Sequence, residues 1–179
     1  QTVNFFKSDY MFKKILNKGE FSWILFDWAN SAFATTVMAG FFPIFFKAYW
    51  STGDDVHIST AKLATANSIA GIIIAVMAPV LGAIADGSGK KSRFLLFFTL
   101  TGSAGCFFLP FVDSGNWHLA ILFYIIASVG FFSSNIFYDS MLVDVSPDEK
   151  SYDIISSAGF AMGYLGGGIL FLINVLWTL

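Results

Sequence analysis

The stretch GAIADGSGKKSR, residues 82–93, is a short basic segment between two long apolar runs. The run before it covers residues 64–81, the run after it covers residues 94–110, and neither contains a charged side chain. Apolar runs of this length are typical of helices that cross a bilayer. Short loops rich in Lys and Arg stay on the cytoplasmic side during insertion. The stretch therefore predicts two membrane-spanning helices joined by a cytoplasmic loop.

The composition also indicates a membrane protein. Of the 179 residues, 56% are hydrophobic and only 12% are charged, and the mean hydropathy is +0.69. Soluble domains carry about 25% charged residues. A net charge of -2 and a pI near 5.5 argue against nucleic acid as a partner, because phosphates call for a basic surface. We expect an all-α protein whose main partner is the lipid bilayer.

No pattern in the sequence points to an enzyme. The single cysteine, Cys106, lies in an apolar run, and His57 and His118 lie far apart in expected connections. Covalent catalysis needs a nucleophile beside a base, and a metal site needs several ligands at short spacing. We therefore expect no catalytic residue, no metal and no cofactor.

Five apolar segments predict five membrane spans. They cover about residues 21–46, 61–85, 94–112, 117–143 and 148–178. Pro43 is expected to kink the outer end of the first span, and the third span is expected to pack through plain apolar side chains. Residues 1–20 are expected to form a cytoplasmic segment without a signal peptide, with Met11 as the true start.

The positive charges predict a cytoplasmic N-terminus and a last span that ends outside. Lys47 and Lys62 fall outside in this arrangement. The cations that fall inside are Lys7, Lys13, Lys14, Lys18, Lys90, Lys91, Arg93 and Lys150. An excess of Lys and Arg on one side sets the orientation. In a bacterium the chain would be a multi-pass protein of the inner, or plasma, membrane.

Polar residues form one stripe on the first span and a second stripe on the fourth. Asp27, Asn30 and Ser31 follow helical spacing in FDWANSAF, and Asn135 and Asp139 lie one turn apart near the inner end of the fourth span. A carboxylate within a span costs about 2.5–3.5 kcal/mol on insertion scales, so it should face protein or water. We expect these residues to line a substrate or proton pathway, in which at least one carboxyl group binds a proton or a cationic group. The alternative is a structural hydrogen bond between spans.

Small residues form faces on the second and fifth spans. Gly71 and Gly82 lie on one face of the second span, where Ala75 and Ala78 complete the pattern. The glycines of the fifth span that repeat every four residues are Gly159, Gly163 and Gly167. Glycine at a helix surface allows close approach of another helix. We expect helix packing at both faces, against partner helices that the chain itself lacks.

The basic loop resembles the signature loop between the second and third helices of major facilitator superfamily transporters. The matching positions are Gly82, Ile84, Asp86, Gly89, Lys90 and Lys91, and Arg93 belongs to the same loop. Gly87 stands where the family usually has a basic residue, and Phe94 replaces a closing aliphatic residue. The resemblance implies a gating loop in which Asp86 meets a helix end in the second half of the transporter.

Three further motifs narrow the resemblance. FDWANSAF, FYDSMLVDVSP and SSAGFAMGYLGGG look like the uncharacterised major facilitator branch that is related to the autophagy-linked vacuolar effluxers. That family has two six-helix halves around a cavity lined partly by the first and fourth helices of each half. Sugar and drug transporters of the major facilitator superfamily often carry an arginine early in the fourth helix. This chain has no Lys or Arg between Arg93 and Lys150.

The resemblance implies that the five spans are an N-terminal fragment, forming most of one six-helix half. Its partners would be the missing C-terminal helices, a small-molecule substrate and a coupling proton. The expected function is secondary active transport of small solutes by alternating access, with amino acids suggested by analogy with the vacuolar effluxers. The alternative is a five-span scaffold or assembly subunit that transports nothing.

Overall fold

The structure is a computed structural model that describes residues 16–87, 89–146 and 149–178. The regular elements of this described part are all helical, and five segments are long and apolar enough to cross a membrane. These segments are Lys18–Trp50, Val56–Gly87, Lys91–Phe111, Trp117–Val145 and Ser151–Thr178. The predicted all-α fold with five spans is therefore confirmed. The expectations for Met11 and its neighbouring lysines, and for a fifth span starting at residue 148, lie outside the described residues.

The helix of the first span extends beyond the predicted start of that span. Helix α1, Lys18–Ala32, is preceded by Asn17, whose side-chain oxygen accepts a hydrogen bond from the amide of Glu20 at 2.9 Å. In return, the Glu20 carboxylate accepts a hydrogen bond from the backbone amide of Asn17 at 2.7 Å. This capping box satisfies amide groups that a helix start leaves free. The helix consequently starts three residues before the predicted Phe21.

The C-terminal part of the first span contains wider helical turns around Pro43. The π-helical segments η2, Phe33–Phe41, and η3, Phe46–Trp50, flank the short helix α2, Phe42–Phe45. The Phe42 amide donates to the carbonyl of Val37, five residues earlier. Proline lacks an amide hydrogen and its ring crowds the preceding turn, and π-helical turns are one cause of helix distortion. The expected disturbance at Pro43 therefore takes the form of π-helical hydrogen bonding on both sides.

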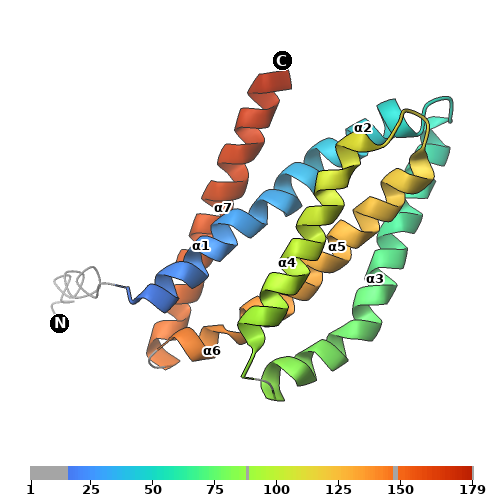
Figure 1. Ribbon diagram of the computed structural model, residues 1–179. Coiled ribbons are helices and arrows are strands. Elements are labelled where there is room, and N and C mark those ends of the chain that lie inside the picture. Colours follow the sequence, from blue (N-terminus) through green and yellow to red (C-terminus); the bar gives the residue numbers. More distant parts are fainter. Residues whose placement is uncertain (1–15, 88, 147–148, 179) are drawn as a thin grey trace, which may run out of the picture.

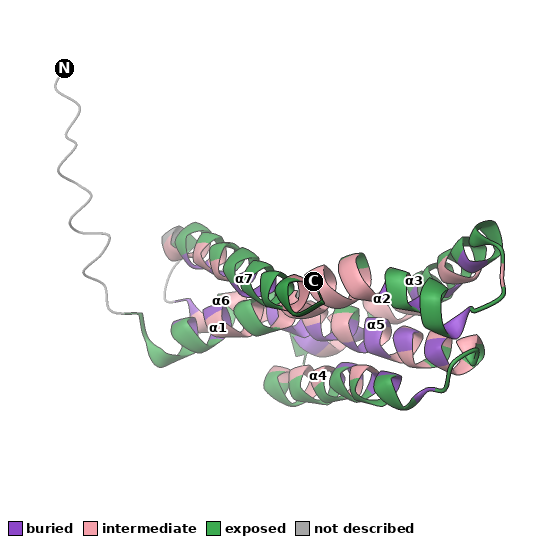
Figure 2. Ribbon diagram, turned by 90° about the horizontal axis from the view of Figure 1, so that it is seen from above, coloured by how far each residue is buried: buried purple, intermediate pink, exposed green. Residues whose placement is uncertain are grey.

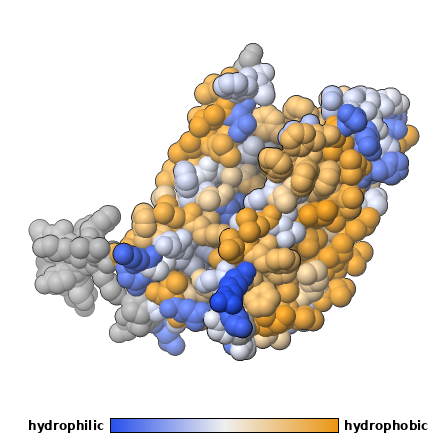
Figure 3. Space-filling model, in the orientation of Figure 1, coloured by the Kyte–Doolittle hydropathy of each residue, from blue (hydrophilic) through white to orange (hydrophobic). Residues whose placement is uncertain are grey.

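The remaining helices pack against either α5 or the first span. They are α3 (Val56–Gly87), α4 (Lys91–Phe108), the short 3-10 turn η4 (Leu109–Phe111), α5 (Trp117–Ser140), α6 (Leu142–Val145) and α7 (Glu149–Thr178). Helix α5 packs against α4 and α3, while α7 packs against α1 and η2 (Figure 1). Buried residues gather along α5, and the outer faces of α4 and α7 are exposed (Figure 2). The surface is broadly apolar, with hydrophilic residues towards the helix ends (Figure 3), as a lipid environment requires.

Glycines bring α4 and α5 into backbone contact. A Cβ atom placed on Gly130 would lie 2.4 Å from the amide nitrogen of Gly102, and one on Gly105 would lie 2.7 Å from that of Ala127. No side chain fits between backbones at this separation. The expectation of plain apolar packing for the third span did not include these glycines, and Gly102 and Gly105 are its contact points with α5.

The glycines of α7 face the first span. Added Cβ atoms would lie 2.7 Å from a ring carbon of Trp23 at Gly159, 2.7 Å from Ser31 Oγ at Gly163 and 2.8 Å from Thr35 Oγ1 at Gly167. Gly166, which the four-residue pattern omits, is tighter still, since its Cβ would lie 2.2 Å from the Trp28 carbonyl oxygen. The fifth span thus finds its packing partner within the chain, contrary to the expectation that this partner is missing.

The glycine face of the second span is open. A Cβ atom added to Gly71 or Gly82 would meet nothing within 4 Å. Large apolar side chains on the same helix, such as Ile72 and Val76, are also exposed. The packing predicted for Gly71 is therefore not found among the described residues, because no described helix covers this side of α3.

Candidate functional site

A cavity of about 670 Å³ lies between α1, α5 and α7. Its polar lining includes the four residues that the sequence predicts for a substrate or proton pathway, Asp27, Asn30, Asn135 and Asp139. The other residues that line it are Trp23, Ser31, Ala34, Thr35, Phe131, Tyr138, Leu142, Ser156, Phe160, Gly163 and Tyr164. The two polar stripes thus face one shared cavity, which we call the central cavity.

An amide pair joins the two stripes. Asn30 donates a hydrogen bond from Nδ2 to Oδ1 of Asn135 at 2.6 Å. Both residues are partly buried, and they come from different spans. A hydrogen bond between side chains within a membrane contributes modestly to helix association and fixes the facing of the helices. This bond orients α1 and α5 so that both carboxylates face the same space.

Asp27 lies half-buried on the wall formed by α1. Its Oδ1 accepts a hydrogen bond from Ser31 Oγ at 3.4 Å, one turn further along the helix. On the facing helix, a Cβ at Gly163 would lie only 3.0 Å from Asp27 Oδ2. Gly163 therefore provides the space that the carboxylate occupies, and it links the predicted packing face to the predicted pathway.

Asp139 lies on the wall formed by α5 and is exposed. Asp27 lines the same cavity from the facing wall. The ion pairs among the described residues join Lys62 with Asp54 and Lys91 with Asp144. Neither cavity carboxylate forms an ion pair with a described residue, so both are available to a ligand or a proton.

Two aromatic residues that the sequence analysis did not select, Trp23 and Tyr138, line the central cavity. Trp23 donates from Nε1 to the Tyr138 carbonyl oxygen at 2.9 Å, and the two rings stack at 4.2 Å between centroids. Phe26 stacks on Tyr138 at 5.0 Å. The Tyr138 hydroxyl is buried without a hydrogen-bond partner among the described residues. In the sequence, Tyr138 directly precedes the selected residue Asp139, and this is the signal that could have identified it.

The basic loop is tied to the end of the fourth span. Lys91 Nζ lies 2.8 Å from Asp144 Oδ2 and donates a hydrogen bond to the Ser140 carbonyl oxygen at 2.9 Å. Asp86, Lys90 and Arg93 are exposed. The structure therefore places Lys91 in a contact within this half, and leaves Asp86 without an ion pair among the described residues.

A second polar network, which we call the outer-loop network after its predicted side of the membrane, lies at the helix ends opposite the basic loop. Lys62 and Ser51 donate hydrogen bonds to the carboxylate of Asp54. These bonds, the one from Lys62 above all, hold the pKa of Asp54 below its ordinary value. The Lys62 ammonium also lies 3.8 Å from the centroid of the Trp117 ring. This network connects the loop after the first span to the starts of α3 and α5.

Comparison with known proteins identifies the family to which this chain belongs. Residues 17–145 match the family described as "Vacuole effluxer Atg22 like". The chain belongs to this vacuole effluxer family. It is also 42% identical over 163 residues to the protein named "Uncharacterized MFS-type transporter YxiO" from Bacillus subtilis (strain 168), across 90% of this chain and 38% of that protein. No solved structure matches the chain.

The family match confirms the resemblance inferred from the sequence motifs. All four pathway residues lie inside the matched range, whereas Gly163 and the rest of α7 lie beyond it. The names of the vacuole effluxer family and of the Bacillus relative describe transporters, so the chain is not an enzyme. The chain spans 38% of the length of this relative.

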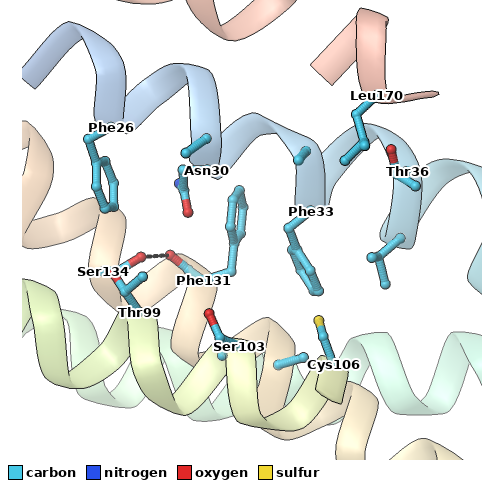
Figure 4. Close-up of a pocket in the computed structure, with 15 residues that line it drawn as sticks. Phe26, Asn30, Phe33, Thr36, Thr99, Ser103, Cys106, Phe131, Ser134 and Leu170 are labelled. Carbon is cyan, nitrogen blue, oxygen red and sulfur yellow. Dashed lines mark hydrogen bonds between the residues drawn. The ribbon is translucent and has the colours of Figure 1, made fainter. Parts of the chain in front are cut away.

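A smaller cavity of about 440 Å³ lies between the first span, α4 and α5 of this vacuole effluxer family member. Cys106 points from α4 towards the ring of Phe33, and Ser103 points from the same helix towards Phe131 (Figure 4). The Ser134 hydroxyl donates to the Phe131 carbonyl oxygen at 2.7 Å. The lining is mainly apolar and contains no charged side chain among the described residues. It therefore lacks the groups that would bind an ionic solute.

Proposed function

We propose that this chain is the N-terminal part of a secondary active transporter that moves small solutes by alternating access. The observation that carries the proposal is the meeting of Asp27, Asn30, Asn135 and Asp139 in one cavity between membrane-spanning helices. Carboxylates inside spans are costly and usually serve a substrate or ion pathway. The vacuole effluxer family and the transporter name of the Bacillus relative support this class of function.

The proposed mechanism uses the central cavity as one half of a shared binding site. Alternating access requires two helix bundles that rock about a site between them. The further helices would come from the part of the protein that corresponds to the remaining length of the relative, of which this chain spans 38%. Asp86 would meet a helix end of that second bundle, while the contact between Lys91 and Asp144 anchors the loop in this one.

Coupling to a proton is part of the proposal. Desolvation and mutual repulsion both favour the protonated form of one member of a carboxyl pair. Proton binding at Asp27 or Asp139 would remove a charge from the cavity before the bundles rock. The proposed orientation places the N-terminus and the basic loop in the cytoplasm, and amino acids are the solute class that analogy with the vacuolar effluxers suggests.

Transport by the full-length protein in liposomes tests this function. The vesicles are supplied with mixtures of amino acids and amines, with and without an imposed proton gradient. Saturable movement of at least one solute, abolished by a protonophore, is the expected result. A protein that inserts and folds but leaves the vesicles impermeable to every solute would contradict the proposal and favour a membrane scaffold.

A further inference from the structure

The central cavity contains negative charge without a positive side chain to balance it. Asp27 and Asp139 both line it, and its described lining residues include no Lys, Arg or His. The ion pairs of the described residues lie at the outer loop and at the basic loop, and involve other carboxylates. A carboxylate within a membrane span is costly, and such residues usually face a water-filled cavity or pair with an opposite charge. The cavity is therefore electrostatically complementary to a cation.

Tyr138 supplies an independent observation at the same place. Its side chain is 6% exposed, and its hydroxyl has no hydrogen-bond partner among the described residues. Buried polar side-chain atoms are nearly always paired. The stack with Trp23 holds the ring in place, and Gly159 leaves the hydroxyl free of a facing side chain, since an added Cβ would lie 3.2 Å from it. Tyr138 lines the central cavity, and its hydroxyl has a free lone pair with which it can accept a hydrogen bond from a ligand group.

The rest of the lining suits an apolar group that carries a positive head. Trp23 and Phe131 from the first and fourth spans, and Phe160 and Tyr164 from α7, all border the cavity. Aromatic faces attract ammonium groups and also bury hydrocarbon. The volume of about 670 Å³ suits a small organic molecule. The asparagine amides are already paired with each other across 2.6 Å.

We infer that the solute bound in the central cavity is an organic amine in its ammonium form. The ammonium group lies between the carboxylates of Asp27 and Asp139 and donates its third hydrogen to the Tyr138 hydroxyl. The apolar part of the amine lies against the aromatic side chains. This inference rests on the proposed transport function and narrows its substrate class. It favours amines over amino acids, because the carboxylates of Asp27 and Asp139 would repel an α-carboxylate held beside the bound ammonium group.

Binding of three matched probes to the purified full-length protein tests the inference. The probes are 2-phenylethylamine, the neutral 2-phenylethanol and the zwitterion phenylalanine, and their affinities are measured by titration calorimetry without any transport. The amine is expected to bind more tightly than both analogues. Asp27→Asn, Asp139→Asn and Tyr138→Phe are each expected to weaken amine binding by roughly 10-fold or more, as loss of a charge-assisted hydrogen bond does.

Matched controls separate the cavity from the rest of the surface. Asp113→Asn removes an exposed loop carboxylate and Tyr49→Phe removes an exposed tyrosine hydroxyl, so both should bind the amine as the wild type does. Equal binding of the alcohol or of phenylalanine would overturn the inference, and so would no binding of the amine or unchanged affinity in the three cavity variants. Transport of another solute despite such a result would leave the proposed function standing. Selective amine binding without any transport would contradict the function alone.

Discussion

Asn30 and Asn135 form a side-chain hydrogen bond of 2.6 Å between the first and fourth spans. The bond joins two residues 105 positions apart in the chain, at the point where both polar stripes reach the central cavity. Each amide satisfies a polar group of the other. The pair therefore has a structural role beside its place in the proposed pathway.

The amide pair predicts non-additive effects on stability. Asn30→Ala and Asn135→Ala should each destabilise the full-length protein by about 1–2 kcal/mol, because each leaves the other amide unpaired. The loss of unfolding free energy in the double variant should be smaller than the sum of the losses in the two single variants. Unfolding in mixed detergent micelles measures all three. Additive losses would show that the two side chains do not interact in the membrane.

Gly166 and Gly168 offer a matched test of helix packing on α7. A Cβ at Gly166 would lie 2.2 Å from a backbone oxygen of Trp28, whereas one at Gly168 would meet nothing within 4 Å. Gly166→Ala should therefore lower the free energy of unfolding by about 1–3 kcal/mol through overpacking, and so lower the melting temperature. Gly168→Ala should leave the melting temperature nearly unchanged. Thermal unfolding in detergent compares the two. Equal melting temperatures for both variants would mean that α1 and α7 are not in backbone contact.

The sequence predicts the number of spans and the two polar stripes because both depend on patterns along one helix. Asp27 and Asn30 repeat with helical spacing, as Asn135 and Asp139 do, and an intramembrane carboxylate must face away from lipid. Nothing in that argument shows that the two stripes face each other. Their meeting in one cavity depends on the contacts of α1 with α5 and α7.

Features that depend on a partner helix were predicted poorly. Gly71 and Gly159 belong to similar small-residue faces, yet only Gly159 lies against another described helix. Gly166 was missed because the sequence analysis counted glycines at intervals of four. A helix has 3.6 residues per turn, so the neighbours Gly166 and Gly167 can both face the first span. Tyr138 was missed because an aromatic residue in an apolar span is ordinarily packing, and only its buried, unpartnered hydroxyl distinguishes it.

The outer-loop network predicts a pH-dependent contribution of Asp54. Hydrogen bonds from Lys62 and Ser51 hold its pKa below the ordinary value of about 3.9. A lowered pKa in the folded state means that the ionised group stabilises the fold above the ordinary value, and that this contribution is lost as pH falls through the lowered value. Asp54→Asn should therefore lower the melting temperature at neutral pH.

Melting curves between about pH 7 and pH 3, a range that brackets an aspartate titration, measure this effect. The difference between the wild type and Asp54→Asn should shrink as the solution becomes acidic. Asp113→Asn controls for the removal of one exposed loop carboxylate. A difference of constant size over the whole range would contradict the assigned role of the Asp54 charge.

The charge distribution predicts the orientation of the spans. In a Cys106→Ser background, a cysteine is introduced at Thr52 in the loop after the first span or at Gly89 in the basic loop, both of which are exposed. A membrane-impermeant thiol reagent added to intact cells should label Thr52→Cys and leave Gly89→Cys unlabelled until the cells are permeabilised. The reverse pattern would place the basic loop outside and invert the proposed topology.

The role of Asp27 is the central claim, and transport by the Asp27→Asn variant of the full-length protein tests it most directly. The substitution keeps the size of the side chain and removes its charge and its capacity to take up a proton. Uptake into liposomes should be abolished at every pH between about 5 and 8, a range that brackets the titration of a carboxyl group in an apolar site. Expression and insertion should stay normal, and Asp113→Asn should transport as the wild type does. Wild-type uptake by Asp27→Asn throughout this range would show that the polar stripe is structural and that the central cavity is not the transport site.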